Sequence, residues 1–215
     1  MLLGCHISIA KGFPQAVENA HRLGCQSFQF FTKNPRAFCG KPADPEQAQR
    51  GRALMAGYGL VAVAHAPYIT NLSTPDPELQ EISIQSLKQD LENAEAYGAI
   101  GCVCHMGKHV DMGEAYGMSR MVETLNRLLE AYTGPCPLLL ENTAGQGSEL
   151  GTTLEQCLEV RARVEQPERI GFCFDTCHGF AAGTYRPEEW MAFLEQARAT
   201  GYWQLLRAVH LNDSK

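Results

Sequence analysis

Residues 170–178 read IGFCFDTCH, an apolar run that ends in a carboxylate, a thiol and an imidazole within four positions. A short continuous apolar run is typical of a strand that is buried on both faces of a parallel sheet. Asp175, Cys177 and His178 would then lie at the carboxyl end of that strand. Such a cluster suits thiol redox work, metal binding or nucleophilic catalysis, so the rest of the chain has to discriminate among them.

Further runs of this kind alternate with segments whose apolar residues recur at three- and four-residue spacing, as in residues 118–132. This alternation predicts helices that cover a parallel sheet. Seven strands are expected, centred on residues 3–7, 28–31, 61–64, 101–104, 138–140, 171–174 and 206–209. The pattern leaves two architectures, a doubly wound open sheet and a (β/α)8 barrel.

Local signals support the repeated strand–helix unit. Glycines that follow helical segments predict left-handed helix stops at Gly24, Gly59, Gly98, Gly134 and Gly201. Thr152 and Glu155 have the spacing of a capping box at the start of a helix.

Ionisable side chains at the strand ends favour the barrel. They are His65, His105, Glu141, Asp175 and His210, separated by 40, 36, 34 and 35 residues. A (β/α)8 barrel builds its site from one group on each of several consecutive strands, whereas an open sheet concentrates its site at one switch point. We therefore predict an α/β fold, a (β/α)8 TIM barrel, in which residues 1–215 form a single incomplete domain with strands 1–7 and without the last strand–helix unit.

Composition restricts the classes of function. The net charge of −6 and the pI near 5.6 argue against binding nucleic acid through bulk positive charge, although a local basic site is compatible with them. The sequence shows neither the apolar run of about 18 residues that a membrane span needs nor a secretory signal, so a cytoplasmic protein without membrane association is expected. Nine cysteines without a CxxC motif indicate free thiols in a reducing compartment.

The mixed nitrogen and oxygen donors at the strand ends, with His178 beside them, suit zinc or manganese better than calcium or an iron–sulfur cluster. Cys102 and Cys104 alternate with the inward positions of their strand and should pack against helices. Thiol catalysis at Cys177 would leave the other strand-end donors without a purpose. Residues 145–151 miss the dinucleotide-binding spacing, so no nucleotide cofactor is expected. Phosphodiester hydrolysis and sugar isomerisation both remain open at this point.

Five runs resemble the endonuclease IV family of zinc-dependent apurinic/apyrimidinic endonucleases: FFTKNPRAF (30–38), HAPYITNL (65–72), LLLENTAGQGSELG (138–151), FDTCHGFAAG (174–183) and HLNDSK (210–215). The likeness extends along the whole chain. It implies a deoxyribonuclease IV-type hydrolase of base excision repair. Such an enzyme cuts double-stranded DNA 5′ to an abasic site and leaves a 3′-hydroxyl, with three zinc ions at its site.

The resemblance assigns metal ligands at His65, His105, Glu141, Asp175, His178 and His210. It implies that His65 and His105 bind one zinc and that Glu141, the catalytic residue, bridges this ion to a second. Asp175 and His210 would complete the second site, and His178 would bind the third zinc. Arg36 and Tyr68 match family residues that enter the DNA at the lesion, and Lys33 would join Arg36 and Lys41 in a local basic patch.

The chain ends five residues after His210, before the eighth strand. In the family the following part supplies further ligands to the second and third zinc ions, so the third site is incomplete here. We expect a fragment of a longer, monomeric protein, and we expect the fragment alone to be poorly soluble or oligomeric and slow. The alternatives are a divalent-metal sugar isomerase or epimerase of the same barrel superfamily and an inactive DNA-binding remnant.

Overall fold

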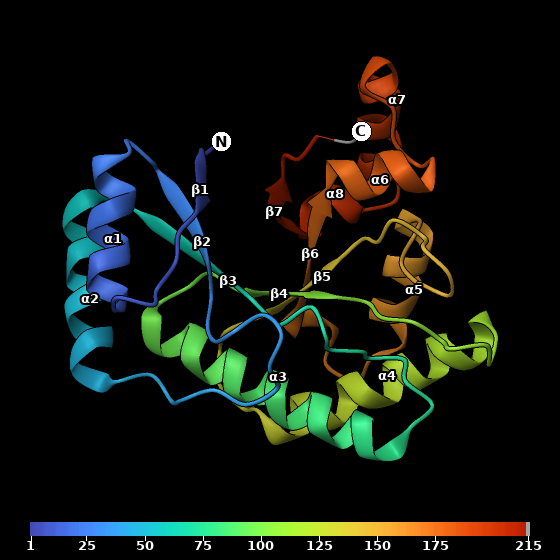
Figure 1. The fold of residues 1–215 in the computed structure, drawn as a ribbon. Helices are drawn as coiled ribbons and strands as arrows, with labels where there is room; N and C mark the ends of the chain where they lie inside the picture. The colour runs from blue at the N-terminus through green and yellow to red at the C-terminus, as the bar shows by residue number, and fades with distance from the viewer. Residues whose placement is uncertain (214–215) are drawn as a thin grey trace.

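Seven parallel strands follow one another in the computed structural model, which describes residues 1–213 (Figure 1). Their order in the sheet is their order in the chain, β1-β2-β3-β4-β5-β6-β7. The strands are β1 (Gly4–His6), β2 (Ser27–Phe31), β3 (Val61–His65), β4 (Cys102–His105), β5 (Leu138–Glu141), β6 (Ile170–Asp175) and β7 (Leu206–His210). All seven predicted strands are confirmed, and their shared direction brings all carboxyl ends to one edge of the sheet.

The helices lie in an arc around the outside of the strands (Figure 1). They are α1 (Phe13–Arg22), α2 (Pro45–Tyr58), α3 (Pro77–Tyr97), α4 (Glu114–Ala131), α5 (Leu154–Arg163), α6 (Thr176–Ala182), α7 (Trp190–Ala199) and α8 (Tyr202–Leu205). Two short 3-10 turns, η1 (Pro167–Arg169) and η2 (Pro187–Glu189), complete the set. Among residues 1–213, no helix is long and apolar enough to cross a membrane.

The sheet has a different core on each face. Helix residues pack on the outer face together with Cys102 and Cys104, as the alternation of the strand predicts. The inner face has a smaller cluster made of Val103, Leu139 and Cys173. Since Val103 precedes His105 by two residues and Leu139 precedes Glu141 by two, the inner side chains lead directly to the ionisable groups at the strand ends.

Four of the five predicted glycine stops have the expected left-handed backbone, and one does not. Gly59 and Gly98 cap α2 and α3 with φ of 66° and 74°. Gly134 has no positive φ, because α4 already ends at Ala131 and the next residue is extended. A Cβ at Gly134 would overlap side-chain atoms of Glu95 and Tyr132, so close packing explains the glycine there.

The capping prediction is wrong by one residue. The N-cap of α5 is Thr153, whose side chain accepts a hydrogen bond from the backbone N–H of Gln156. The Gln156 side chain in turn accepts from the backbone N–H groups of Gly151 and Thr152. A Thr-x-x-Gln pair therefore caps this helix in place of the expected Thr-x-x-Glu pair.

Candidate metal centre

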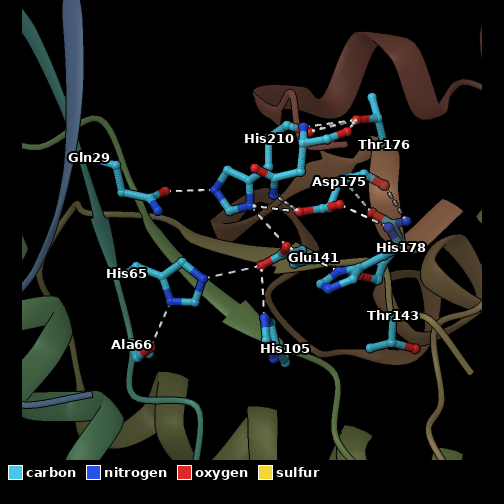
Figure 2. A network of polar contacts seen from close by, with 12 residues as sticks. Gln29, His65, Ala66, His105, Glu141, Thr143, Asp175, Thr176, His178 and His210 are labelled. Carbon is cyan, nitrogen blue, oxygen red and sulfur yellow. Dashed lines mark hydrogen bonds and ion pairs between the residues drawn. The ribbon is translucent and has the colours of Figure 1, made fainter. Parts of the chain in front are cut away.

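The structure brings the six predicted ligand residues together at the carboxyl edge of the sheet (Figure 2). The shared ends of neighbouring parallel strands explain the convergence, since His105 is in register with Glu141 and Asp175 with His210. The next strand over, β3, ends at His65, and His178 comes from the first turns of α6. One side chain from each of five strands thus points into a single space.

Glu141 lies at the middle of this space and presents its two oxygens to different pairs of imidazoles. Its Oε2 is 3.3 Å from His65 Nε2 and 3.2 Å from His105 Nε2. Its Oε1 is 2.9 Å from His210 Nδ1 and 3.3 Å from His178 Nδ1. The carboxylate is only 1% exposed, whereas the side chains of His105 and His178 are each 27% exposed. A carboxylate held in this way has the form of a bridge between two cation sites.

Backbone carbonyl groups fix the orientation of two of the rings. His65 Nδ1 is 2.7 Å from the carbonyl oxygen of Ala66, and His178 Nδ1 is 2.9 Å from that of Asn142. A carbonyl oxygen accepts only, so Nδ1 must carry the proton in both rings. The Nε2 lone pair is then free, which is the arrangement found in histidines that bind metal.

The second carboxylate, Asp175, is held by three neighbours. Its Oδ1 accepts the backbone N–H of His178 at 2.9 Å and so caps α6. Its Oδ2 accepts the Asn212 side-chain amide at 2.6 Å and lies 3.6 Å from His210 Nδ1. Asn142 joins the ends of β5 and β6, because its side chain bonds both the backbone N–H and the carbonyl of Asp175. The carboxylate therefore has little freedom to turn.

Sequence reasoning missed Gln29, Asn142 and Asn212. Gln29 Oε1 lies 2.7 Å from His210 Nε2, and this contact reaches from β2 to β7 across the mouth (Figure 2). Gln29 is a polar residue inside the apolar run FQFF, which was the available signal. The roles of Asn142 and Asn212 had no such signal, because each depends on contacts between different strands.

The electrostatic field of the site favours positive charge. Burial alone would raise the pKa of Glu141, but contacts with four imidazoles hold it well below its ordinary value. Burial opposes the charged form of His210, yet hydrogen bonding to Asp175, Cys173 and Glu141 raises its pKa to about 12. The pKa of His178 is also raised: burial is the largest single influence and lowers it, but the contacts with Glu141, Asp175 and the Asn142 carbonyl together outweigh burial. Two ionised, buried carboxylates therefore attract cations to this space.

The same residues fit a metal centre. Glu141 Oε2 is buried, and within residues 1–213 it has no partner with hydrogen-bond geometry, although two imidazole nitrogens face it. Donor atoms close enough to share an ion occur in two groups, His65–Glu141–His210 and His105–Glu141–His178. Nitrogen and carboxylate donors of this kind suit zinc and manganese. Bound cations would give the unsatisfied oxygen its missing partner.

The side chains expected to contact DNA lie at the rim, with one exception. Tyr68 is 56% exposed, and its ring packs 5.7 Å from that of His105 between centroids. Arg36 is exposed on the loop between β2 and α2, and the carbonyl of the preceding Pro35 accepts the backbone N–H of Tyr68 at 3.0 Å. Lys33 does not join Arg36 in the expected basic patch: its side chain is 2% exposed, and its ammonium is 3.0 Å from Asp90 Oδ2. A buried, paired ammonium has no access to a phosphate.

Comparison with known proteins identifies the family. Residues 17–215 match the family model described as xylose isomerase-like TIM barrel. A protein of Symbiobacterium thermophilum named "Probable endonuclease 4" is 84% identical over 215 residues, which are 100% of this chain and 78% of the relative. The chain belongs to the endonuclease IV family. "Probable endonuclease 4" of Methanoculleus marisnigri is also similar, at 39% identity over 219 residues, covering 100% of this chain and 78% of that protein.

The solved structure of endonuclease IV from Thermus thermophilus matches with a TM-score of 0.88 at 35% identity, covering 99% of this chain and 77% of that one. The predicted TIM-barrel class and the prediction of a nuclease among the hydrolases are thereby confirmed at the level of the family. A D-tagatose 3-epimerase-like protein matches with a TM-score of 0.66 at 15% identity, covering 98% of this chain and 92% of that chain. This second likeness shows a shared fold alone.

Proposed function

We propose that the chain is the metal-binding barrel of an endonuclease that hydrolyses double-stranded DNA 5′ to abasic sites and leaves a 3′-hydroxyl, as in base excision repair. The observation that carries the proposal is Glu141, whose two oxygens each face a separate pair of imidazoles in a family of endonucleases. Two adjacent cation sites can stabilise both the attacking and the leaving oxygen in phosphodiester hydrolysis.

Zinc is the cofactor that we propose, with manganese as the second candidate. His65 and His105 would hold one ion together with Glu141 Oε2, since their Nε2 atoms both lie within 3.3 Å of that oxygen. His210 and Asp175 would hold a second ion on the Oε1 side. The free Nε2 of His178 would serve a third. When bound, such ions act as Lewis acids that activate water and neutralise charge on the scissile phosphate.

The chain's own residues have separable roles in this proposal. Glu141 keeps the two ion sites adjacent, and its low pKa keeps it ionised throughout the neutral range. Ala66 and Asn142 hold two imidazoles in the ligating tautomer through backbone carbonyls. Tyr68 covers the His105 ring, and together with Arg36 it would enter the DNA at the lesion. An abasic nucleotide has no base pair to lose, so its extrusion towards the site is favourable relative to that of an intact nucleotide.

A nicking assay with a matched control tests the proposal. The purified chain is loaded with zinc, and its metal content is measured by plasma mass spectrometry. It is then incubated with a duplex that carries one abasic site and with the intact duplex. We expect cleavage of the abasic strand only and 3′-hydroxyl ends that a polymerase extends. Cleavage should be lost in Glu141→Gln but not in Glu149→Gln, which changes a carboxylate paired with the exposed Lys108.

Two other results would contradict the proposal and favour a different one. Selective binding of the abasic duplex without cleavage, at full metal occupancy, would indicate a DNA-binding protein without activity. Turnover of a free ketose together with indifference to abasic DNA would indicate a sugar isomerase or epimerase, a class to which the chain is linked by its fold alone.

A further inference from the structure

The loop that carries Arg36 joins β2 to α2 and spans residues 32–44 without any helix or strand. Loops of this length are uncommon in compact domains unless something holds them or they serve a function. Within the loop, the Asn34 side chain accepts the backbone N–H of Arg36 at 2.9 Å, and its carbonyl accepts that of Ala37 at 3.0 Å. These bonds form a tight turn with Arg36 at its tip. The turn itself does not fix where the loop stands relative to the metal centre.

One face of α3 fixes the position of the loop. Ser86, Gln89, Asp90 and Asn93 are spaced three and four residues apart and therefore lie on the same side of the helix. Gln89 accepts the backbone N–H of Gly40 at 3.0 Å. Asn93 accepts the N–H of Ala43 at 2.7 Å and donates to the carbonyl of Lys41 at 3.1 Å. This face, which we call the α3 clamp, thus binds the second half of the loop through backbone groups.

The first half of the loop is tied by a buried ion pair. Lys33 Nζ lies 3.0 Å from Asp90 Oδ2 and donates to the carbonyl of Ser86 at 2.8 Å. The hydroxyl of Thr32 donates to the other oxygen of Asp90. The side chains of Lys33 and Asp90 are 2% and 0% exposed. Because both partners are buried, losing one would leave the other charge unpaired away from water, which costs more than breaking a surface salt bridge.

The two ties enclose the segment that the proposed function places against DNA. Residues 34–39 lie between the ion pair at Lys33 and the bond at Gly40, and the Pro35 carbonyl connects this segment to the backbone of Tyr68. The backbone segments that carry Arg36 and Tyr68 are therefore joined before any ligand arrives. Order that exists before binding reduces the entropy lost on binding and so increases affinity.

We infer that Asp90, through its buried ion pair with Lys33, is a positioning residue that sets the Arg36 loop for the damaged DNA strand. The inference rests on the proposed function, which supplies abasic DNA as the ligand. The contacts of the α3 clamp supply the geometry. Asp90 lies outside the metal centre, on the helix side of the sheet. Its loss should therefore weaken DNA binding and leave the metal ions and the chemical step unchanged.

The test compares Asp90→Asn with Glu92→Gln, which changes an exposed carboxylate on the same helix that pairs with Lys88 at 3.4 Å. Asn93→Ala is a second, milder variant that removes only the bonds at Lys41 and Ala43. Arg36→Ala sets the scale of a lost DNA contact. Each variant is measured for metal content, for amide hydrogen exchange of residues 34–40, for the dissociation constant of an abasic duplex, and for kcat and KM.

We expect Asp90→Asn to speed exchange in residues 34–40 and to raise the dissociation constant and KM by about tenfold, as the loss of a preformed loop conformation predicts. Two quantities should stay within about twofold of the parent: kcat at saturating DNA, and the metal content. A contact that is lost equally from the ground state and the transition state changes KM and leaves kcat unchanged. Asn93→Ala should give a smaller change in the same direction, and Glu92→Gln none.

Faster exchange without any change in DNA affinity would overturn the inference, because the tie would then be purely structural. Unchanged exchange in both Asp90→Asn and Asn93→Ala would overturn it as well. A parent protein that does not prefer abasic over intact DNA would contradict the proposed function instead. In that case the exchange measurement would still decide whether the α3 clamp holds the loop.

Discussion

The stability of the protein should depend on pH through Asp90 in a direction opposite to that of an ordinary salt-bridged carboxylate. Burial is the largest influence on this group and raises its pKa from 3.8 to about 6, against the lowering effects of Lys33 and Thr32. The other titratable groups that sense it are the buried thiols of Cys102 and Cys104 on β4. Burial raises the pKa of both thiols, so neither titrates in the acidic range.

The sign follows from the raised pKa. The folded state holds the Asp90 proton more tightly than the unfolded state, so this group's contribution to stability is complete below pH 3.8 and is lost as the pH rises through about 6. A shift from 3.8 to about 6 corresponds to about 3 kcal/mol, because each pKa step of one is worth ~1.4 kcal/mol. Above pH 7 the contribution should be constant.

Urea unfolding of metal-free protein between pH 3.5 and pH 8 measures this effect, in steps of about half a pH unit, as the width of a single titration requires. The difference in unfolding free energy between the parent and Asp90→Asn cancels the titration of the metal centre, and Glu92→Gln is the control. If Asp90→Asn does not fold, the double variant Lys33→Met/Asp90→Leu replaces it as the reference, because it also lacks the Asp90 carboxyl. Apolar replacement of a buried ion pair is often tolerated. A difference curve that is flat across this range would refute the raised pKa, and a rise with pH would show that the ion pair outweighs burial.

Three further changes test the site and its support. Glu141→Gln should reduce bound zinc to less than one ion per chain by plasma mass spectrometry, because the buried bridge between both pairs of imidazoles is lost; undiminished zinc would contradict the ligand assignment. Asn142→Ala should weaken metal affinity in a chelator competition, because Asn142 holds the backbone of the ligand Asp175. The expected loss is about 10- to 100-fold, as for other residues that support metal ligands. An unchanged metal affinity would refute this supporting role of Asn142. Gly107→Ala should lower the unfolding free energy by about 1–3 kcal/mol, the usual cost of a strained backbone. Gly107 has φ of 100°, and a Cβ there would overlap Asn71 Oδ1. The control is Gly57→Ala, at a position where a Cβ meets open space.

Much of the site followed from the sequence because parallel strands impose a simple geometry. Side chains that end parallel strands must meet at one edge, so His65, His105, Glu141, Asp175 and His210 could be brought together from their spacing alone. Alternation along a strand likewise assigned Cys102 and Cys104 to the helix side, and both lie in the outer core. These conclusions depend only on backbone periodicity.

Two of the three errors have the opposite character, since they depended on contacts between distant segments. Lys33 was expected in a basic patch, and only the approach of α3 reveals Asp90 opposite its ammonium. Gly134 reads as a helix stop, whereas the side chains of Glu95 and Tyr132 are what exclude a Cβ there. The helix cap moved from Thr152 to Thr153 because hydrogen-bond geometry selects one of two adjacent threonines.

The sequence by itself determined the strand–helix repeat, the strand ends and the set of donor atoms, because hydrophobic periodicity and strand direction are local properties. Tertiary structure alone decided that Glu141 faces two pairs of imidazoles, that Gln29 reaches His210 from β2 to β7, and that α3 holds the Arg36 loop through Asp90. Such contacts join residues far apart in the chain. Their partners are fixed by packing and burial, which no short stretch of sequence specifies.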